Sequence, residues 1–273
     1  MQTDEIRLSE PAYWEGLYDG AVLPRAYDPD DASLRNSLRR YLMAEIDLGW
    51  AEAGIAPGGR LLEVGCGASF MLPAIARRHA MRAEGIEYSP SGCASARAML
   101  ARESVAGVVH QADLFAPPAV LAGAFDVVTS FGVMEHFTET SVALAAGAAW
   151  LRPGGVQMVC IPNLAGINGA GLRRWRRDLF DIHVVLDAQA LAGAHGRAGL
   201  EVIAVRYVCP FYPFDFLTHL PRRKGVIGAV LRVLRAAGLA ASAAGWAVDR
   251  MSGARLRAGR LCAPWVFCWS RKL

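Results

Sequence analysis

The chain has 273 residues, of which 53% are hydrophobic and 20% are charged, and its formal net charge is +4 at pH 7. This composition excludes an intrinsically disordered chain, and the length allows one large domain or two small ones. The mild positive charge does not by itself indicate nucleic-acid binding. The first ten residues carry acids and no apolar run, so no secretory signal is expected. Six cysteines without metal-finger spacing predict reduced thiols in a cytoplasmic protein.

Short apolar segments alternate with helix-like segments from residue 60 onward. Strands are predicted at residues 60–64, 82–86, 107–110, 125–130, 156–161, 201–208 and 263–270, and helices at 70–79, 90–101, 139–151 and 187–198. This alternation is typical of βαβ units, so the sequence predicts an α/β fold with a doubly wound sheet. Two segments interrupt it: residues 162–186 are predicted as a long polar loop, and residues 210–260 as an insertion before the last strand.

The segment RLLEVGCGASF, residues 60–70, joins the first strand to a glycine-rich turn. No lysine follows the glycines, which excludes a P-loop. The dinucleotide fingerprint needs a third glycine where Phe70 stands, and its pyrophosphate would lie beside the acid Glu63. An acid at this position favours a cationic ligand such as S-adenosylmethionine, which carries an ammonium and a sulfonium.

Two further acids follow at matching positions. Glu87 ends the second strand, where an acid about 20 residues beyond the glycines can bind both ribose hydroxyls. Asp113 follows the third strand, where its carboxylate can accept a hydrogen bond from an adenine amino group.

The series E-V-G-C-G, G-I-E-Y, A-D-L-F, F-D-V-V-T-S and L-R-P-G-G resembles, in order and spacing, the motifs of the class I S-adenosylmethionine-dependent methyltransferases of small-molecule type, over roughly residues 57–161. The resemblance implies a Rossmann-like sheet of seven strands with the last strand antiparallel, and S-adenosyl-L-methionine as cofactor. It implies that the glycine turn binds the methionine end of the cofactor, that Glu87 binds the ribose, and that the following residues bind adenine or offer backbone to the methionine. The cofactor-binding residues are then Glu63, Gly65, Cys66, Gly67, Glu87, Tyr88, Asp113, Leu114, Ser130 and Phe131.

The resemblance also defines the domain organisation that we expect. A single methyltransferase domain would comprise a helical cap at residues 1–56, a cofactor-binding core at 57–208, a helical lid insertion at 209–260 and a final strand at 261–273. In the cap, Tyr13, Trp14 and Tyr18 are expected to fold over the cofactor, since aromatic faces suit a sulfonium. The alternative is that they attach the first helix to the core.

Two histidines are candidates for a catalytic base. His136 lies in VMEHF, after the fourth strand, and His183 lies in FDIHVV, in the loop after the fifth. A structural histidine bonded to backbone is the alternative for each. The MEHF stretch also resembles the quinone O-methyltransferases, in which an E-x-x-E-H pattern can supply metal ligands. Here Gly132 replaces the first acid, and because two ligands make a poor site, no metal is expected.

Aromatic residues gather where the insertion begins, at Phe211, Tyr212, Phe214 and Phe216, and they predict an apolar acceptor pocket. Residues 225–248 are long and apolar enough for a membrane span, but Arg232 and Arg235 near the middle favour an amphipathic helix. Three roles stay open for this helix, in this order: packing against the sheet domain, a lid over an apolar acceptor, and contact with a membrane surface.

The predicted function is methyl transfer to a small apolar or aromatic acceptor at oxygen. The alternatives are N- or C-methylation of a small metabolite, and a protein that binds the cofactor or a partner without turnover. The basic run RRWRRD, residues 173–178, is expected to be a solvated helical face, because nucleic-acid binding would need more such patches. Nothing in the sequence indicates an obligate protein partner.

Overall fold

The computed structural model describes residues 6–33, 36–252 and 256–273. The other residues of the predicted cap, 1–5 and 34–35, and of the predicted insertion, 253–255, lie outside the described residues. Within the described part, seven strands form one sheet in the order β3-β2-β1-β4-β5-β7-β6. They are β1 (Arg60–Val64), β2 (Arg82–Glu87), β3 (Gly107–Gln111), β4 (Phe125–Phe131), β5 (Leu151–Pro162), β6 (Leu200–Val208) and β7 (Trp265–Lys272).

The predicted Rossmann-like sheet with an antiparallel last strand is confirmed. Strands β1 to β5 pair in parallel, while β7 is inserted antiparallel between β5 and β6. The residues of β7 alternate between the two faces of the sheet, with Phe267 and Trp269 on one and Val266 and Cys268 on the other. This period of two places large apolar side chains on both faces, so both must be covered by helices.

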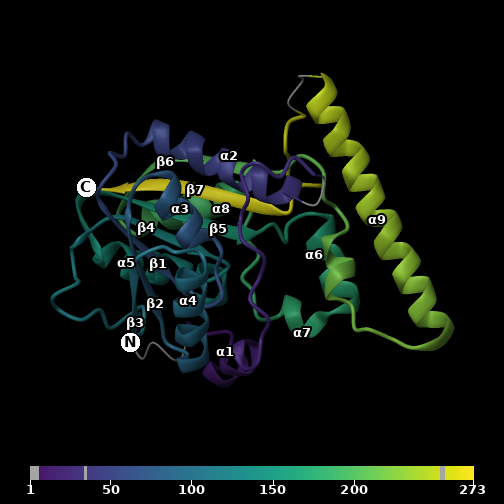
Figure 1. Cartoon of the computed structure of the whole chain (residues 1–273), viewed down its shortest axis with the longest axis horizontal. Helices are drawn as coiled ribbons and strands as arrows, with labels where there is room; N and C mark the ends of the chain where they lie inside the picture. Colours follow the sequence, from purple (N-terminus) through teal and green to yellow (C-terminus); the bar gives the residue numbers. More distant parts are fainter. Residues whose placement is uncertain (1–5, 34–35, 253–255) are drawn as a thin grey trace.

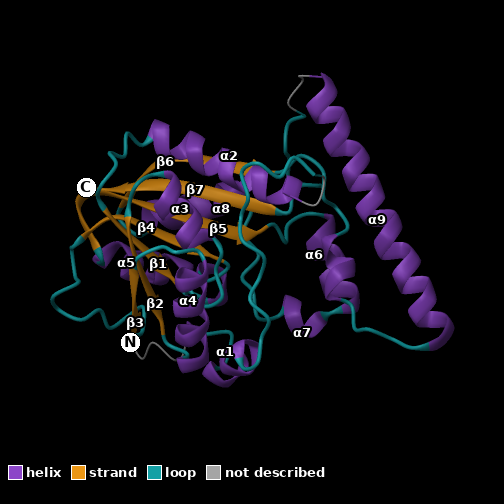
Figure 2. Cartoon of the chain, in the orientation of Figure 1, coloured by secondary structure: helices purple, strands orange, loops and turns teal. Residues whose placement is uncertain are grey.

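Helices cover both faces of the sheet (Figures 1 and 2). Helices α2, α3 and α4 pack in the hydrophobic cluster of one face, and α5 and α8 in the cluster of the other. The described helices are α1 (Pro11–Tyr18), α2 (Ser37–Glu52), α3 (Met71–Arg78), α4 (Pro90–Arg102), α5 (Thr140–Ala149), α6 (Ile167–Trp175), α7 (Arg177–Phe180), α8 (Ala188–Arg197) and α9 (Gly225–Ser252), with the 3-10 turns η3 (Met134–His136) and η4 (Asp215–His219).

The crevice for a ligand follows from the strand order. After β1 the chain runs to β2 and β3 on one side, whereas β4 lies on the other side of β1 and leads on to β5. The connections that leave β1 and β4 therefore diverge, and a crevice opens at the carboxyl ends of these two strands. All the cavities described below lie at this edge of the sheet.

The prediction of a long loop at residues 162–186 is wrong, because this segment folds into α6 and α7. Its glycines, which indicated a loop, allow close packing instead. A side chain at Gly171 would collide with the ring of Phe216 in η4, and one at Gly169 would collide with the backbone of Leu164. The buried face of α6 is thus short, and Phe216 of the distant insertion covers part of it. For this reason the sequence of α6 shows no clear apolar period.

The predicted helix in the insertion is present as α9, but it stands away from the sheet (Figure 1). It contacts η4 and the aromatic residues that precede η4. A side chain at Gly245 would touch Phe211, and one at Gly238 would touch Phe214, so both glycines let these rings lie against the helix. Packing against the sheet domain, the first of the three expected roles, therefore describes one face of this helix, which contacts η4 and these aromatic residues instead of the sheet itself.

Helix α2 packs so closely on the sheet that only glycine, which has no side chain, fits at one of its positions. An added methyl at Gly49 would lie far inside van der Waals contact with the fully buried ring of Trp269. We expect Gly49→Ala to lower the free energy of unfolding by about 1–3 kcal/mol, the usual cost of overpacking, although alanine favours a helix. Urea unfolding would measure this.

The matched control is Gly196→Ala in α8, where the added methyl meets open space. Its free energy of unfolding should stay equal to that of the wild type or rise by up to about 1 kcal/mol. A Gly49→Ala variant as stable as this control would contradict the packing of α2 on Trp269.

Candidate active site

The glycine-rich turn after β1 brings bare backbone to the crevice. Gly65 has a φ of +69°, a conformation that glycine adopts without strain. Its N–H donates to the carbonyl of Ile86 in β2 at 2.9 Å. A side chain at Gly65 would collide with Val133. The turn therefore holds the main chain beside the crevice, with no side chain to fill it.

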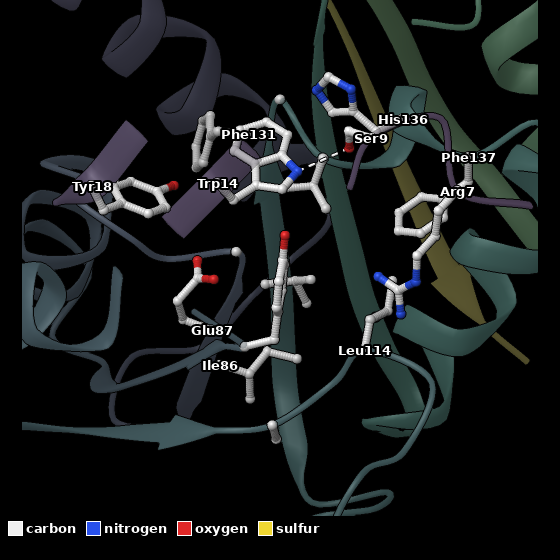
Figure 3. A pocket seen from close by; sticks show the side chains of 16 residues that line it. Arg7, Ser9, Trp14, Tyr18, Ile86, Glu87, Leu114, Phe131, His136 and Phe137 are labelled. Carbon is white, nitrogen blue, oxygen red and sulfur yellow. Dashed lines mark hydrogen bonds between the residues drawn. The ribbon is translucent and has the colours of Figure 1, made fainter. Parts of the chain in front are cut away.

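A cavity of about 150 Å³, the inner cavity, opens over this turn (Figure 3). It collects the ends of β1, β2 and β4, the segment after β3, and helix α1. It brings together six of the residues that the sequence assigned to the cofactor, namely Trp14, Gly65, Glu87, Tyr88, Leu114 and Phe131. Its other lining residues are Arg7, Ser9, Tyr18, Val64, Ile86, Ala112, Gly132, Val133, His136 and Phe137.

Glu87 presents a buried carboxyl to the inner cavity (Figure 3). Its oxygens accept hydrogen bonds from the N–H of Ser89 at 2.9 Å and of Gly67 at 3.3 Å. Burial raises the pKa of Glu87 above its usual value, and these two N–H donors oppose the rise. The carboxyl is thus fixed by backbone while it still borders the cavity, as a group that binds two hydroxyls requires.

Helix α1 contributes Trp14 and Tyr18 to the lining of the inner cavity. Trp14 donates its indole N–H to Ser9 Oγ at 2.9 Å and lies edge-on to His136, with ring centroids 4.9 Å apart. Tyr18 lies against Gly67, where a side chain would collide with its ring. Tyr13, by contrast, borders only the second cavity described below and is 40% exposed.

Asp113 is not among the residues that line either cavity, although its neighbours Ala112 and Leu114 line the inner one. Its carboxylate forms an ion pair with Arg7 and accepts the N–H of Phe115 at 2.9 Å. Arg7 in turn lies within 5.5 Å of the ring centroids of Phe115 and Phe137. Sequence reasoning missed Arg7, because a lone arginine more than a hundred positions from its partner leaves no pattern.

Two more predicted cofactor residues lie behind the cavity walls. Ser130 is fully buried at the end of β4, and its hydroxyl has no hydrogen-bond partner among the described residues. Gly67 is covered by Tyr18. Cys66 does border the second cavity, and burial raises the pKa of its thiol.

A larger cavity of about 860 Å³, the outer cavity, adjoins the inner one. The two share Trp14, Tyr18, Gly65, Phe131, Gly132 and His136. Beyond this shared wall, the outer cavity is bordered by the glycine turn, by α6 through Asn168 and Leu172, and by η4 through Asp215, Phe216 and His219. A ligand in the inner cavity and one in the outer cavity would meet at the shared wall.

Only one of the four predicted acceptor-binding aromatics, Phe216, borders the outer cavity. Phe211 and Phe214 lie against glycines of α9, and the ring of Tyr212 lies 5.6 Å from that of Trp246. These three rings pack against α9, which offers them an apolar surface, and do not border the outer cavity. The sequence could not indicate this, because a run of aromatic residues does not show which of them face a cavity.

Glu63, at the end of β1, borders the outer cavity and is 1% exposed. Burial raises the pKa of its carboxyl to about 8, and the Ser69 hydroxyl opposes this shift only in part. One of its oxygens has no partner among the described residues. A buried carboxyl without a counter-charge is costly, and a bound cation would relieve that cost.

His136 and His183 meet at the shared wall, with ring centroids 4.4 Å apart. His136 donates its Nδ1–H to the Ile182 carbonyl at 2.7 Å, and His183 donates its Nδ1–H to the Leu179 carbonyl at 2.6 Å, so the Nε2 of each is left as an acceptor. Burial lowers the pKa of His136 to about 4 and also lowers that of His183. Both rings are therefore neutral at pH 7.

The buried carboxyl of Glu135 completes this cluster. Ligand atoms of Glu135, His136 and His183 all lie within 4.8 Å of one another, and neither oxygen of Glu135 has a partner among the described residues. The sequence counted two ligands here and expected no metal for that reason. The fold supplies His183 as a third, so two nitrogens and a carboxylate form a donor set that fits a divalent cation with open positions.

The sequence profile of a family described as "Methyltransferase domain" matches residues 34–205. The chain belongs to this family, the class I S-adenosylmethionine-dependent methyltransferases. The cofactor of the family is S-adenosylmethionine, and the crevice fits the ammonium of such a molecule, because one oxygen of the buried Glu63 has no partner among the described residues.

Among the curated relatives is the ubiquinone biosynthesis O-methyltransferase of Aromatoleum aromaticum, 34% identical over 110 residues that cover 40% of this chain and 46% of the relative. Another is the ribosomal protein L11 methyltransferase of Dechloromonas aromatica, 30% identical over 159 residues, or 56% of this chain and 50% of the relative. The chain therefore spans about half the length of these relatives.

Solved structures agree with the fold over nearly the whole chain. The [4+2]-cyclase SpnF has a TM-score of 0.61 at 19% identity and covers 98% of this chain and 96% of its own. The geranyl diphosphate C-methyltransferase from Streptomyces coelicolor A3(2) has a TM-score of 0.60 at 14% identity, with coverage of 99% and 98%. At such identities these likenesses show the shared fold.

The buried state of Glu63 predicts proton release when a cationic ligand binds. With a pKa of about 8, the carboxyl is mostly protonated at pH 7, and an adjacent ammonium favours the carboxylate. We expect S-adenosylhomocysteine, which carries that ammonium, to release a proton on binding and to bind more tightly as the pH rises from 6 toward 8. Calorimetry at pH 7 in two buffers of different ionisation enthalpy measures this release.

Glu63→Gln should remove most of the released proton, whereas Glu201→Gln, an exposed acid on β6, should leave it unchanged. Equal proton release by the wild type and Glu63→Gln would show that Glu63 does not face the ammonium.

Proposed function

We propose that the protein transfers the methyl group of S-adenosylmethionine to a hydroxyl oxygen of a small apolar or aromatic acceptor. The observation that carries this proposal is that His136 belongs to the shared wall of the two cavities and that its Nδ1–H donates to a backbone carbonyl, which leaves Nε2 as an acceptor. Methyl transfer depends on holding two reactants in line at one such point.

The division of the two cavities between cofactor and acceptor follows from their residues. When bound, the cofactor supplies a methyl group that its sulfonium has already activated. In the proposed arrangement Glu87 accepts hydrogen bonds from the ribose hydroxyls, and Tyr88 and Leu114 enclose the adenine in the inner cavity. Glu63, which borders the outer cavity, binds the ammonium. Trp14 and Phe131 then border both molecules at the shared wall.

His136 is the proposed base for the acceptor hydroxyl. Its Nδ1–H is held by the Ile182 carbonyl, which fixes the tautomer and leaves Nε2 to accept a proton. His183 keeps the same tautomer through Leu179 and lies on the acceptor side of His136, in the outer cavity. Because both rings are neutral at pH 7, neither needs to lose a proton before it can accept one.

A metal-assisted form of the same reaction is favoured by one observation: within the described part of the chain, neither oxygen of Glu135 has a hydrogen-bond partner. Glu135, His136 and His183 would hold a divalent cation, and the cation would act as a Lewis acid on the acceptor hydroxyl. The relatives named as ubiquinone biosynthesis O-methyltransferases support O-methylation in either form.

The proposal is tested by the product that the enzyme makes. Purified protein with methyl-labelled S-adenosylmethionine should methylate phenols with apolar substituents, and not the matched methyl ethers that lack a free hydroxyl. Mass spectrometry locates the label. Methylation of the corresponding anilines or of ring carbon instead would assign N- or C-methyl transfer. Binding without turnover on any of them would support a non-methylating role, and the likeness to a [4+2]-cyclase gives such a role a precedent in this fold.

The base assignment predicts the effect of one substitution. His136→Ala should lower turnover by about 10²–10⁴-fold, the usual contribution of a general base, while the affinity for S-adenosylhomocysteine stays within a few-fold. The control is His110→Ala, because His110 pairs with Glu84 on β2 and borders neither cavity. Unchanged turnover in His136→Ala would refute the assignment.

Removal of metal separates the two forms of the reaction. For a base acting alone, treatment with a chelator should leave the turnover of the wild type unchanged. Lost turnover that an added divalent cation restores, together with loss of metal binding in Glu135→Gln, would establish the metal-assisted form.

A further inference from the structure

Most of the surface of α9 faces solvent, and this surface is apolar. Among the described helices, α9 is the one with the length and composition to cross a membrane, with a mean hydropathy of 1.6 over its most apolar window, of which 17% is buried. Figure 1 shows the helix at the margin of the molecule, with α6 between it and the sheet. An apolar helix this exposed needs a partner surface in water.

One face of α9 already has its partner. Gly238 and Gly245 admit the rings of Phe214 and Phe211, and the Ser242 hydroxyl donates to the Gly238 carbonyl. Arg235 on the same face donates to the carbonyls of Leu217 and Leu220. This face fixes the helix to the domain and leaves large apolar side chains such as Val226, Val233 and Met251 exposed to solvent.

A second face carries large apolar side chains at helical spacing. Val226, Val230, Val233 and Met251 recur at intervals of three, four and their multiples, with small alanines between them. Their exposed fractions run from 51% for Val230 to 86% for Met251. These residues define the outer stripe of α9, which points away from the face that contacts η4 by the helical period.

The charges around the outer stripe have one sign. Residues 220–252 contain six Lys and Arg residues and one acid, Asp249. Asp249 accepts hydrogen bonds from the Tyr41 hydroxyl and from the N–H of Leu256, so it is engaged with the domain. Arg222, Arg223 and Lys224 stand exposed directly before the helix.

We propose that α9 docks the enzyme on an anionic lipid bilayer. The helix lies in the plane of the interface, the outer stripe enters the acyl boundary, and Arg222, Arg223 and Lys224 contact lipid phosphates. This is the third role that the sequence left open for the segment, and exposure of the outer stripe now favours it. The docking surface does not depend on which acceptor the enzyme methylates.

Two other arrangements are less compatible with the charges. A second copy of the chain paired through the outer stripe would bring the cluster of residues 222–224 against either the same cluster or Arg250, without acids to compensate. A span across the bilayer would bury Arg232 near its centre and would detach Arg235 from its two carbonyl partners.

The same surface lies next to the outer cavity, the proposed site of the acceptor. Phe216 of η4 borders the outer cavity, while Phe214 and Leu217 beside it touch α9. An enzyme held on a bilayer by α9 would therefore keep this side of the outer cavity next to the lipid, where apolar acceptors dissolve.

Vesicle co-sedimentation tests the docking with the full chain. Wild-type protein should bind vesicles that contain about 30% phosphatidylglycerol at least about tenfold more tightly than vesicles of phosphatidylcholine alone, and less tightly as salt rises. Replacing Arg222, Arg223 and Lys224 together by glutamine should weaken binding by about 100-fold, given about 1 kcal/mol for each cation near the surface.

A pair of matched variants tests the outer stripe. Val226→Ser/Val230→Ser/Val233→Ser should lose at least about tenfold in affinity for the anionic vesicles. Val22→Ser/Val108→Ser/Val120→Ser removes three valines of comparable exposure outside α9 and should bind like the wild type. Affinity for S-adenosylhomocysteine checks that each variant is folded.

The proposal fails if the wild type does not bind anionic vesicles, or if the outer-stripe variant binds them as the wild type does. It also fails if light scattering shows a dimer that only the outer-stripe variant dissociates, since a second copy would then be the occupant. None of these results bears on methyl transfer to soluble acceptors, so the proposed function is tested separately.

Discussion

The parallel pairing of β1 with β4 is the constraint on which the site depends. Because the chain leaves these neighbouring strands toward opposite edges of the sheet, their carboxyl ends are not covered by a connection. Gly65 then turns the backbone away without a side chain, and Gly132 does the same after β4, with a φ of +69°. The inner and outer cavities are the two halves of the space that results, and His136 lies where they join.

Two buried acids border this space, and neither forms an ion pair among the residues that the structure describes. Glu63 and Glu135 are each 1% exposed, and burial raises the pKa of both to about 8. Such groups cost stability in the ligand-free protein, since a buried carboxyl with unpartnered oxygens has lost its hydration. Arg7, which lines the inner cavity, shows the opposite solution, because its charge is compensated by an ion pair with Asp113. The contrast favours ligands of positive charge at Glu63 and at Glu135.

The sequence predicted those features that depend on local pattern. All seven strands lie at the apolar segments that predicted them. Gly65, Glu87, Tyr88 and Leu114 come together at the inner cavity, because each of their motifs is a strand end followed by a turn. The sequence did not predict the ion pair of Arg7 with Asp113 or the cluster of His183 with Glu135, because the partners in both contacts are far apart in the sequence. The aromatic residues before η4 were identified as a cluster, but their partner, α9, is set by packing that no local period indicates.

The insertion between β6 and β7 connects the outer cavity to the exposed apolar face of α9. Its first part, η4, closes the outer cavity with Phe216, which stacks on Trp175 of α6 at a centroid distance of 5.4 Å. Its second part, α9, packs against η4 and the residues before it, where its glycines leave room for their side chains, and its opposite, apolar side faces outward. A helix that only capped the cavity would turn its apolar side inward, and one that only spanned a membrane would need no glycines against η4. The observed division of its faces is what an enzyme needs if its acceptors are apolar and collect at a lipid surface.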